Sequence, residues 1–326
     1  MKVLVVTSEW PSEEWPYSGV FVQRQVFALN SLGIETRVFA FRGRASVRRY
    51  WSAFRRLRNC LASESFDLIH AHFGQAGFLA CLATRIPVVV TFHGSDVFGV
   101  GRERGKSLAS ALLRSVSQIA RYLASSVIAV SPLVKEGLGE KDAHVIPMGI
   151  NRDLFRPLAR SDARRQLGWP LDERTVLFVG GANDRVKRFW LAQEAVSHLA
   201  STASFPVALR VCDRVPPDTM PLFLNAADVL VITSVHEGSP VRLREALACG
   251  LPVVSVDVGD ARTRLAGITG CIVTASDSAE SIASALISVL REGKRVDGAL
   301  SLSGLDDRTI AQKLIGVYEG VLAHRR

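Results

Sequence analysis

Two glutamates stand in one stretch of the chain, Asp228–Asp257, which reads D-V-L-V-I-T-S-V-H-E-G-S-P-V-R-L-R-E-A-L-A-C-G-L-P-V-V-S-V-D. Glu237 and Glu245 lie in it with seven residues between them. An ionised carboxylate accepts hydrogen bonds and donates none, so hydroxyl groups suit it as partners. Two such groups beside an anion site would bind the hydroxyls of a sugar and of a ribose.

The sequence around the two glutamates predicts a strand, a loop, a helix and a second strand. Pro240 is placed as a first helical residue, Ser239 as its cap and Gly250 as the glycine that closes the helix. At the carboxyl end of a parallel strand such a loop opens where ligands of α/β sheets bind. The backbone amides of Gly238 and Ser239 are therefore expected to receive a ligand phosphate at the helix N-terminus.

Two isolated glutamates are explained more simply by a loop cap and a solvated helix residue. The whole string E-G-S-P-x-x-x-x-E-A-L-A-C-G-L-P-V-V, however, resembles the signature of retaining glycosyltransferases of family four, which have the GT-B fold. The resemblance implies that Glu237 contacts the donor sugar and that Glu245 holds the ribose of the nucleotide.

Two stretches of the first half carry weaker parts of the same resemblance. Y-S-G-V-F-V-Q-R-Q has one glycine, Gly19, where the family usually has a pair that lets donor phosphate or acceptor approach the backbone. A glycine that only starts a helix is the alternative. T-F-H-G-S-D follows a predicted strand, and His93 in it resembles the active-site histidine that contacts the transferred sugar. Asp96 is expected to anchor its own loop, and the H-A-H of His70 and His72 ends the preceding strand of the chain.

The segment V-G-G-A-N-D-R-V-K-R begins the second half and lacks the G-x-G-x-x-G spacing of dinucleotide sites. The resemblance implies that Lys187 neutralises the donor pyrophosphate. The arginine that the family places after the strand is Gly181 here, and Arg185 could replace it only from elsewhere in the loop. Met148 stands where the family's interdomain turn has an asparagine, so any role of that side chain is lost.

Strands alternate with helices in both halves of the chain, which predicts two doubly wound α/β domains with a cleft between them. We expect an acceptor-side domain over 1–150, a nucleotide-sugar donor domain over 151–305 and a terminal helix over 306–326. The resemblance implies that this helix crosses back onto the first domain.

The composition sets further limits. A chain of 326 residues that is 48% hydrophobic can form two domains. Five cysteines without a C-x-x-C pair argue for a reducing compartment and against a zinc site. No leader pattern and no apolar run long enough for a bilayer appear. We expect a cytoplasmic protein, with peripheral attachment at the inner face of the cytoplasmic membrane as a further hypothesis.

A net charge of +9 indicates attraction to anions such as nucleic acid, anionic lipid or phosphorylated substrates. Arg48, Arg49, Arg55, Arg56 and Arg58 alternate with Trp51 and Phe54 in a predicted helix that would suit an anionic membrane. The alternative is a solvated helix whose aromatic residues pack on the sheet. A second amphipathic helix, 107–122, is expected to turn Leu108, Leu112, Leu113 and Ile119 inward and Lys106, Arg114 and Arg121 outward.

These features predict a retaining glycosyltransferase that moves a sugar from a nucleotide-diphosphate donor to a hydroxyl of a glycan or lipid-linked glycan. Lys187, the helix start at Gly238–Pro240 and Arg185 would stabilise the departing diphosphate, while Glu237 orients the sugar. No cofactor is expected, and the lack of a D-x-D motif predicts a metal-independent reaction. A nucleotide-sugar epimerase of the same fold and a non-catalytic binding module are the alternatives. Nucleic acid as a partner is argued against by the two carboxylates.

Overall fold

The computed structural model describes residues 1–43, 46–99 and 108–324 of the chain. Its Cα positions separate into two compact units. The first unit consists of Met1–Gly149 and Asp307–Arg326, and the second of Ile150–Asp306. The chain therefore leaves the first unit, forms the second, and returns to the first with its last helix.

The first unit is built on a parallel sheet whose strands are short apolar runs such as V-L-V-V and V-V-V. Side chains on both faces of these strands are buried, as expected for a sheet covered by helices on both sides. The strand order is β2 (Glu35–Ala40), β1 (Lys2–Thr7), β3 (Leu68–His72), β4 (Val88–Phe92), β5 (Ser126–Ala129) and β6 (His144–Val145).

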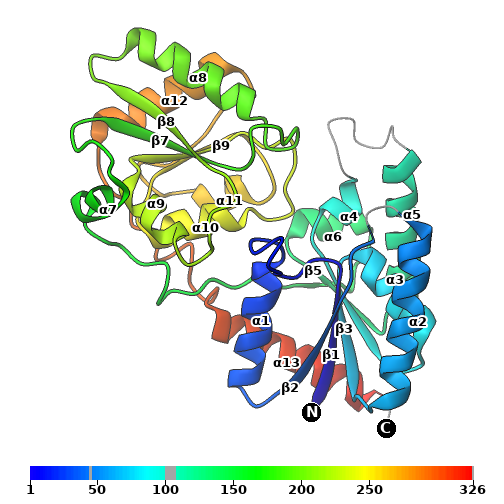
Figure 1. Ribbon diagram of the computed structural model, residues 1–326. Helices are drawn as coiled ribbons and strands as arrows, with labels where there is room; N and C mark the ends of the chain where they lie inside the picture. The colour runs from blue at the N-terminus through cyan, green and yellow to red at the C-terminus, as the bar shows by residue number, and fades with distance from the viewer. Residues whose placement is uncertain (44–45, 100–107, 325–326) are drawn as a thin grey trace. The chain divides into compact units, whose positions relative to one another are not determined.

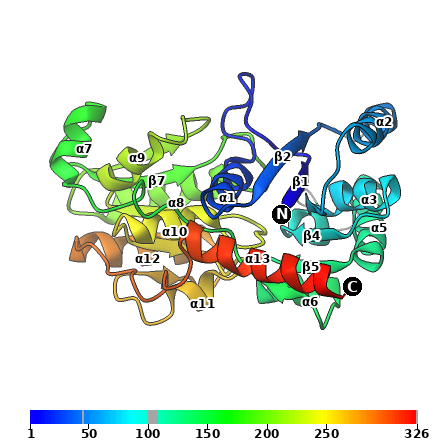
Figure 2. The ribbon, with the colours of Figure 1, turned by 90° about the horizontal axis from the view of Figure 1, so that it is seen from below.

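Helices cover both faces of this sheet (Figure 1). On one face α1 (Val20–Ser31) packs against the terminal helix α13 (Asp307–Ala323), and α2 (Val47–Ser63), α3 (Gly74–Ala83) and α5 (Leu108–Leu123) lie on the other. Two shorter helices, α4 (Ser95–Phe98) and α6 (Pro132–Leu138), follow β4 and β5. Figure 2 shows α13 along the length of the first unit. The contact between α1 and α13 confirms that the terminal helix crosses back onto the first domain's fold.

The second unit contains a parallel sheet in the order β11 (Ile272–Val273), β10 (Val253–Ser255), β9 (Val229–Ile232), β7 (Arg174–Val179) and β8 (Val207–Cys212). Its helices are α7 (Arg160–Leu167), α8 (Phe189–Thr202), α9 (Met220–Ala226), α10 (Val241–Ala248), α11 (Ala261–Leu265) and α12 (Ala279–Glu292). Asp228 links elements of the second unit. Its buried carboxylate accepts a hydrogen bond from the backbone amide of Thr175 at 2.7 Å and another from a side-chain nitrogen of Arg164 at 2.6 Å.

Both sheets reverse their strand order beside their first strand, between β1 and β3 and between β7 and β9. Ligands of open α/β sheets bind at the carboxyl ends of the strands at such a point. The loops after β1, β3, β7 and β9 are therefore the ones that each unit offers for binding. These two parallel sheets with their covering helices confirm the predicted fold class.

Two local expectations were wrong. Helix α10 begins at Val241 rather than Pro240, and the Ser239 hydroxyl donates to Asp260 at 2.9–3.0 Å instead of capping the helix. The nearby carboxylate is the stronger partner, because it is charged.

Helix α5 is turned the other way from the prediction: Leu112 and Ile119 are exposed, and the Arg121 side chain is largely buried beside Glu140. A small-residue face of α5 packs instead, with Ser117 so close to Gly74 of α3 that a Cβ there would lie 2.1 Å from its Oγ. Leu113 and Arg114 are half-buried. Lys106 and the side chain of Leu108 lie outside the described residues. Met148 packs in the core of the first unit.

Candidate functional site

The loops after β7 and β9 bring Lys187 and Glu237 together. Nζ of Lys187 lies 2.5 Å from Oε1 of Glu237, and the Ser234 hydroxyl donates to the same oxygen at 2.9 Å. The stem of Lys187 crosses Gly180, where a Cβ would lie 3.1 Å from its Cγ. A cation and a carboxylate thus stand at the reversal point of the second sheet, both partly exposed.

Arg188 fixes the loop that carries Lys187, and its importance was missed in the sequence. Its Nε donates to the carbonyl of Thr233, and a terminal nitrogen pairs with Asp277 at 2.8 Å. The Thr233 hydroxyl donates back to the carbonyl of Lys187 at 2.7 Å. Arg188 also has φ +53°, a left-handed conformation that is uncommon outside glycine. The loop is therefore held from both sides, which gives Lys187 a defined position.

Glu245 is buried in α10 and is not the solvated residue of the simpler explanation. Its Oε2 forms an ion pair with Arg242, one turn earlier in the same helix. A buried carboxylate requires such a partner, because an unpaired charge in the interior is costly. Arg242 was also missed, although its spacing of three residues from Glu245 was a usable signal.

The helix start at Gly238–Pro240 lies against Gly259, which has φ +59°. A Cβ on Gly259 would lie 2.9 Å from Cδ of Pro240 and 3.3 Å from Cβ of Glu237. The chain can therefore turn here only because this residue lacks a side chain. The turn sets where the first amides of α10 point and where Glu237 stands.

Arg185 is exposed, and no ion pair joins it to any of the described residues. Its neighbour Asp184 shapes the turn by accepting the amides of Val186 and Lys187 at 2.9 Å and 3.3 Å. Gly181 faces the carboxylate of Asp213, which a Cβ would approach to 3.3 Å.

His93 lies in the first unit, so the two units hold different candidate residues. Its Nε2 is 3.1 Å from Nδ1 of His72, and its ring packs against Phe21 and Phe73 with centroids 5.2 Å and 4.4 Å away. Burial, and secondly the charge of His70, lowers the pKa of His93 to about 3. His93 is therefore a neutral imidazole at physiological pH.

Asp96 anchors its own loop, as predicted. Its Oδ1 accepts the amides of His93 and Gly94 at 3.0 Å and 2.8 Å, and its Oδ2 accepts that of Gly74 at 2.9 Å. Burial raises its pKa, and these backbone amides act in the opposite direction. The carboxylate thus ties the loop after β4 to the start of α3 and sets the position of the His93 backbone.

Gly19 precedes α1 with φ +66°, and a Cβ there would lie 2.3 Å from the carbonyl oxygen of Glu9. Glycine is thus required here because the backbone of Glu9 lies against it. This contact supports the alternative in which Gly19 only starts the helix. Whether a ligand also approaches Gly19 stays a prediction.

Two family models match the chain, "Glycosyltransferase Family 4" over residues 1–154 and "Glycosyl transferases group 1" over residues 173–292. TuaC of Bacillus subtilis (strain 168), named as a glycosyltransferase of teichuronic acid biosynthesis, is 30% identical over 79% of this chain and 82% of its own length. The chain belongs to glycosyltransferase family 4. It is a retaining glycosyltransferase that uses a nucleotide-sugar donor, as the motif of Glu237 and Glu245 predicted.

Other relatives of this glycosyltransferase agree with that assignment. The phosphatidyl-myo-inositol mannosyltransferase of Mycobacterium leprae is 30% identical over 82% of this chain and 76% of its own length. Among solved structures, a sucrose-phosphate synthase from Thermosynechococcus elongatus has a TM-score of 0.80 at 18% identity, covering 99% of both chains. HepE of Anabaena in complex with UDP-glucose has a TM-score of 0.73 at 17% identity, covering 98% of this chain and 100% of its own. These structures confirm the GT-B fold.

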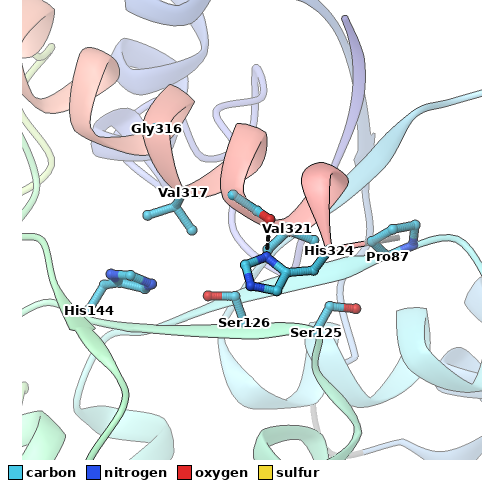
Figure 3. A pocket seen from close by; sticks show the side chains of 9 residues that line it. Pro87, Ser125, Ser126, His144, Gly316, Val317, Val321 and His324 are labelled. Atoms are coloured by element: carbon cyan, nitrogen blue, oxygen red, sulfur yellow. Dashed lines mark hydrogen bonds between the residues drawn. The ribbon is translucent and has the colours of Figure 1, made fainter. Parts of the chain in front are cut away.

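The glycosyltransferase also has a cavity of about 500 Å³ between α13 and the sheet of the first unit. Figure 3 shows His144, Ser125 and Ser126 lining it, with His324 directly after α13, whose Nδ1 lies 2.7 Å from the carbonyl oxygen of Gly320. These strand residues begin β5 and β6 or directly precede β5, whereas His93 follows the end of β4. The cavity is at the opposite edge of the sheet from His93 and is not the candidate site.

Within the described residues, no helix has the length and apolar character needed to cross a membrane. No group of three or more histidine, cysteine, aspartate or glutamate side chains in that part of the chain is arranged to hold a metal ion.

Proposed function

We propose that this glycosyltransferase binds the nucleotide-sugar donor on its second unit and transfers the sugar to a hydroxyl of a glycan or lipid-linked glycan. The observation that carries the proposal is the meeting of Lys187 with Glu237 at the reversal point of the second sheet, followed by the buried Glu245 in α10. The acceptor side is assigned to the first unit, which holds His93.

Lys187 and the first amides of α10 bind the diphosphate. Negative charge develops on the departing nucleotide diphosphate as the glycosidic bond breaks, and groups fixed in advance stabilise it without reorganising. The loop contacts of Arg188 provide this fixation for Lys187. Glu237, released from the ammonium when the diphosphate takes its place, accepts hydrogen bonds from the donor sugar.

Glu245 accepts the ribose hydroxyls while Arg242 holds its other side. An ion pair on a buried carboxylate keeps the carboxylate charged and limits its rotation. Arg242 thereby acts through Glu245, and it is a positioning residue. Arg185 could bind the diphosphate only by reaching it from its exposed position in the loop.

His93 contacts the transferred sugar as a neutral imidazole. A low pKa lets the ring donate one hydrogen bond and accept another without carrying charge. Neutrality suits a site in which positive charge develops on the sugar, because an imidazolium would repel it.

The proposed reaction needs no metal ion, because the positive end of α10 and the ammonium of Lys187 supply the charge that a divalent cation would otherwise give. Likewise, no cofactor beyond the donor substrate is assigned.

The acceptor is proposed to be presented at an anionic membrane surface. Relatives of the chain are named for teichuronic acid biosynthesis and for mannosyl transfer to phosphatidyl-myo-inositol. All five arginines of α2, Arg48, Arg49, Arg55, Arg56 and Arg58, are exposed. Trp51 is 62% exposed and stacks on Phe54 with centroids 5.7 Å apart. Phe54 itself packs against the core, so Trp51 is the residue that would insert.

Helix α5 adds apolar surface to the same unit. Leu112, Ile119, Tyr122 and Leu123 are each at least 46% exposed, and α3 contacts both α5 and α2. Exposed apolar side chains near a row of arginines are typical of helices that lie in a membrane interface. We therefore assign membrane attachment to the face formed by α2 and α5.

A donor panel tests the central proposal. The purified chain is incubated with UDP-, GDP- and ADP-sugars, with and without lipid-linked acceptors, and products are identified by mass. Release of nucleotide diphosphate with one donor class is the expected result. Conversion of the sugar without any release would indicate an epimerase, and binding without either reaction would indicate a binding module.

A further inference from the structure

Three histidines form a connected cluster at the centre of the first unit, and only His93 has a role so far. His70 and His72 are both fully buried on β3, with ring centroids 4.4 Å apart, and the ring of His72 is 5.3 Å from that of His93. Interior positions in a parallel strand are normally apolar. Two histidines here are therefore costly unless their ring nitrogens are used.

His70 is fully used. Nδ1 of His70 lies 2.6 Å from the hydroxyl of Tyr318 on α13, and its Nε2 lies 2.7 Å from Oγ1 of Thr91 on β4. Because a neutral imidazole has one donor and one acceptor, one of these two hydroxyls donates to the ring and the other accepts from it. This assignment leaves His70 with the structural task of joining α13 to the sheet.

His72 is used at one nitrogen only. Its Nδ1 meets Nε2 of His93 at 3.1 Å, while its Nε2 is buried and has no hydrogen-bond partner among the described residues. One ring must donate in this pair and the other accept. If His93 donated, Nε2 of His72 would be a buried N–H with no acceptor, the kind of group that folded proteins avoid most strongly. If His72 donates, its Nε2 is an unprotonated acceptor without a partner, which costs less than a buried N–H without an acceptor. We therefore assign His72 as the donor.

The ring of His93 is also held by Phe73, whose backbone conformation is uncommon. Phe73, directly after His72, has φ +74° and ψ +144°, a conformation that bulky residues rarely adopt. Its ring lies 4.4 Å from that of His93. Strain of this kind persists where the surrounding structure enforces it, commonly at functional sites. Phe73 fixes the plane of His93 while His72 fixes which nitrogen carries the proton.

We propose that His72 is a positioning residue for sugar transfer: its Nδ1–H donates to Nε2 of His93 and holds His93 as the Nδ1–H tautomer. The donor N–H that His93 offers to an oxygen of the reacting sugar is then Nδ1, for which no partner is found in the part of the chain that the structure describes. The inference rests on the proposed function, in which His93 contacts that sugar.

Two variants of His72 separate the hydrogen bond from the packing. His72→Phe keeps a ring in place and removes the donor, whereas His72→Asn keeps an N–H close to the position of Nδ1. Thr91→Val is the matched control, because it removes a hydroxyl partner of His70 and leaves the His72–His93 contact untouched. Each variant is first checked for folding by its thermal transition.

The first measurement is a ¹⁵N ring-nitrogen spectrum of the histidine-labelled full chain without substrate. We expect a protonated Nδ1 and an unprotonated Nε2 for His93 in the wild type, Thr91→Val and His72→Asn, and the appearance of the Nε2–H tautomer in His72→Phe. A protonated Nε2 of His93 in the wild type would overturn the assignment, even if no variant could be prepared.

The second measurement is steady-state transfer with the donor found active in the panel. We expect kcat to fall about 10- to 100-fold in His72→Phe and to recover largely in His72→Asn, with the donor KM nearly unchanged. Equal kcat values for His72→Phe and wild type would refute the positioning role. Absence of transfer by the wild type with every donor would instead count against the proposed function, while the ring spectra would still decide the tautomer.

Discussion

Nζ of Lys187 lies 2.5 Å from Oε1 of Glu237, although the two residues are 50 positions apart in the chain. Each group is the partner that the other must leave when a donor binds, since Lys187 is proposed to bind diphosphate and Glu237 the sugar. Binding is then an exchange of partners, in which the phosphate takes the ammonium and the sugar hydroxyls take the carboxylate.

Lys187→Ala and Glu237→Ala are expected to differ in their effect on the affinity for a nucleotide diphosphate that carries no sugar. Loss of Lys187 removes a charge-assisted contact worth about 1.5–3 kcal/mol, so affinity and turnover both fall. Loss of Glu237 frees the ammonium, so calorimetry should show unchanged or tighter diphosphate binding while turnover falls. Lys294→Ala, an exposed lysine of the same unit, is the control. Weaker diphosphate binding in Glu237→Ala would contradict the exchange.

Glu245→Ala should weaken donor binding by roughly 1–3 kcal/mol, because the ribose hydroxyls lose their acceptor. Arg242→Ala should weaken it as well, since it leaves the buried carboxylate without its ion pair. Calorimetry on both single variants and the double variant forms a cycle, and we expect the two effects to be less than additive. Unchanged nucleotide affinity in Glu245→Ala would rule out its contact with the ribose.

A chelator should leave the transfer rate unchanged, because Lys187 and the start of α10 supply the positive charge at the diphosphate. The rate is measured with the active donor before and after EDTA treatment, and again after magnesium is added back. If EDTA abolishes transfer and magnesium restores it, the metal-free account is wrong.

His70 makes the stability of the first unit depend on pH. Burial lowers its pKa from the ordinary 6.5 to about 3, so between these values the unfolded chain binds one proton more than the folded chain. Its contribution to stability is therefore complete above pH 6.5 and declines by about 1.4 kcal/mol per pH unit as the pH falls toward 3.

His70→Gln removes this titration. Urea unfolding at pH 4, 5 and 6, followed by hydrogen exchange of β3 peptides, should show a shallower pH dependence in the variant. Asp96 and Glu9 titrate in both proteins and cancel in the comparison. Parallel pH dependences in the two proteins would contradict the buried neutral state of His70.

Liposome sedimentation tests the membrane face. Each arginine of α2 can contribute about 1 kcal/mol near an anionic leaflet, and this attraction fades within about 8–10 Å at physiological salt. We expect binding to anionic but not zwitterionic vesicles, lost when Arg48, Arg49, Arg55, Arg56 and Arg58 become Gln, and reduced by Trp51→Ala. Changing the exposed Arg152, Arg291 and Lys294 of the second unit should have little effect. Equal partition into both vesicle types would refute the electrostatic account.

The sequence predicted strands well because their signal is local. Strands such as Lys2–Thr7, Val207–Cys212 and Val229–Ile232 are apolar runs bounded by turn residues, so the alternation of strands and helices in both halves could be predicted from short segments alone. The position of helix α5 in the chain was predicted correctly, but its buried face was not, because the close contact of Ser117 with Gly74 decides which face is buried. Such a contact depends on a neighbour more than forty residues away and leaves no periodic trace in the helix itself.

The residues of the candidate site could be predicted from the sequence, but the partners that their side chains contact could not. Glu237, Glu245 and Lys187 could be identified from their strings, but their ion pairs depend on how loops meet after the sheet has formed. Arg188 stood inside a quoted string and carried no distinguishing pattern of its own, whereas Arg242 could have been found from its spacing of three residues before Glu245. The pairing of His72 with His93 likewise requires β3 and β4 to be neighbours, which the order of the strands settles.

The return of α13 to the first unit has a consequence during synthesis on the ribosome. Tyr318, the partner of His70, emerges only after every residue of the second unit has been made. Until then the nascent first unit lacks the helix that covers α1 and shields the buried imidazole, whereas the second unit already has all its own strands. At about 5–20 residues per second, the inserted unit has seconds in which to fold first. The part of the chain that is made first is thus completed last.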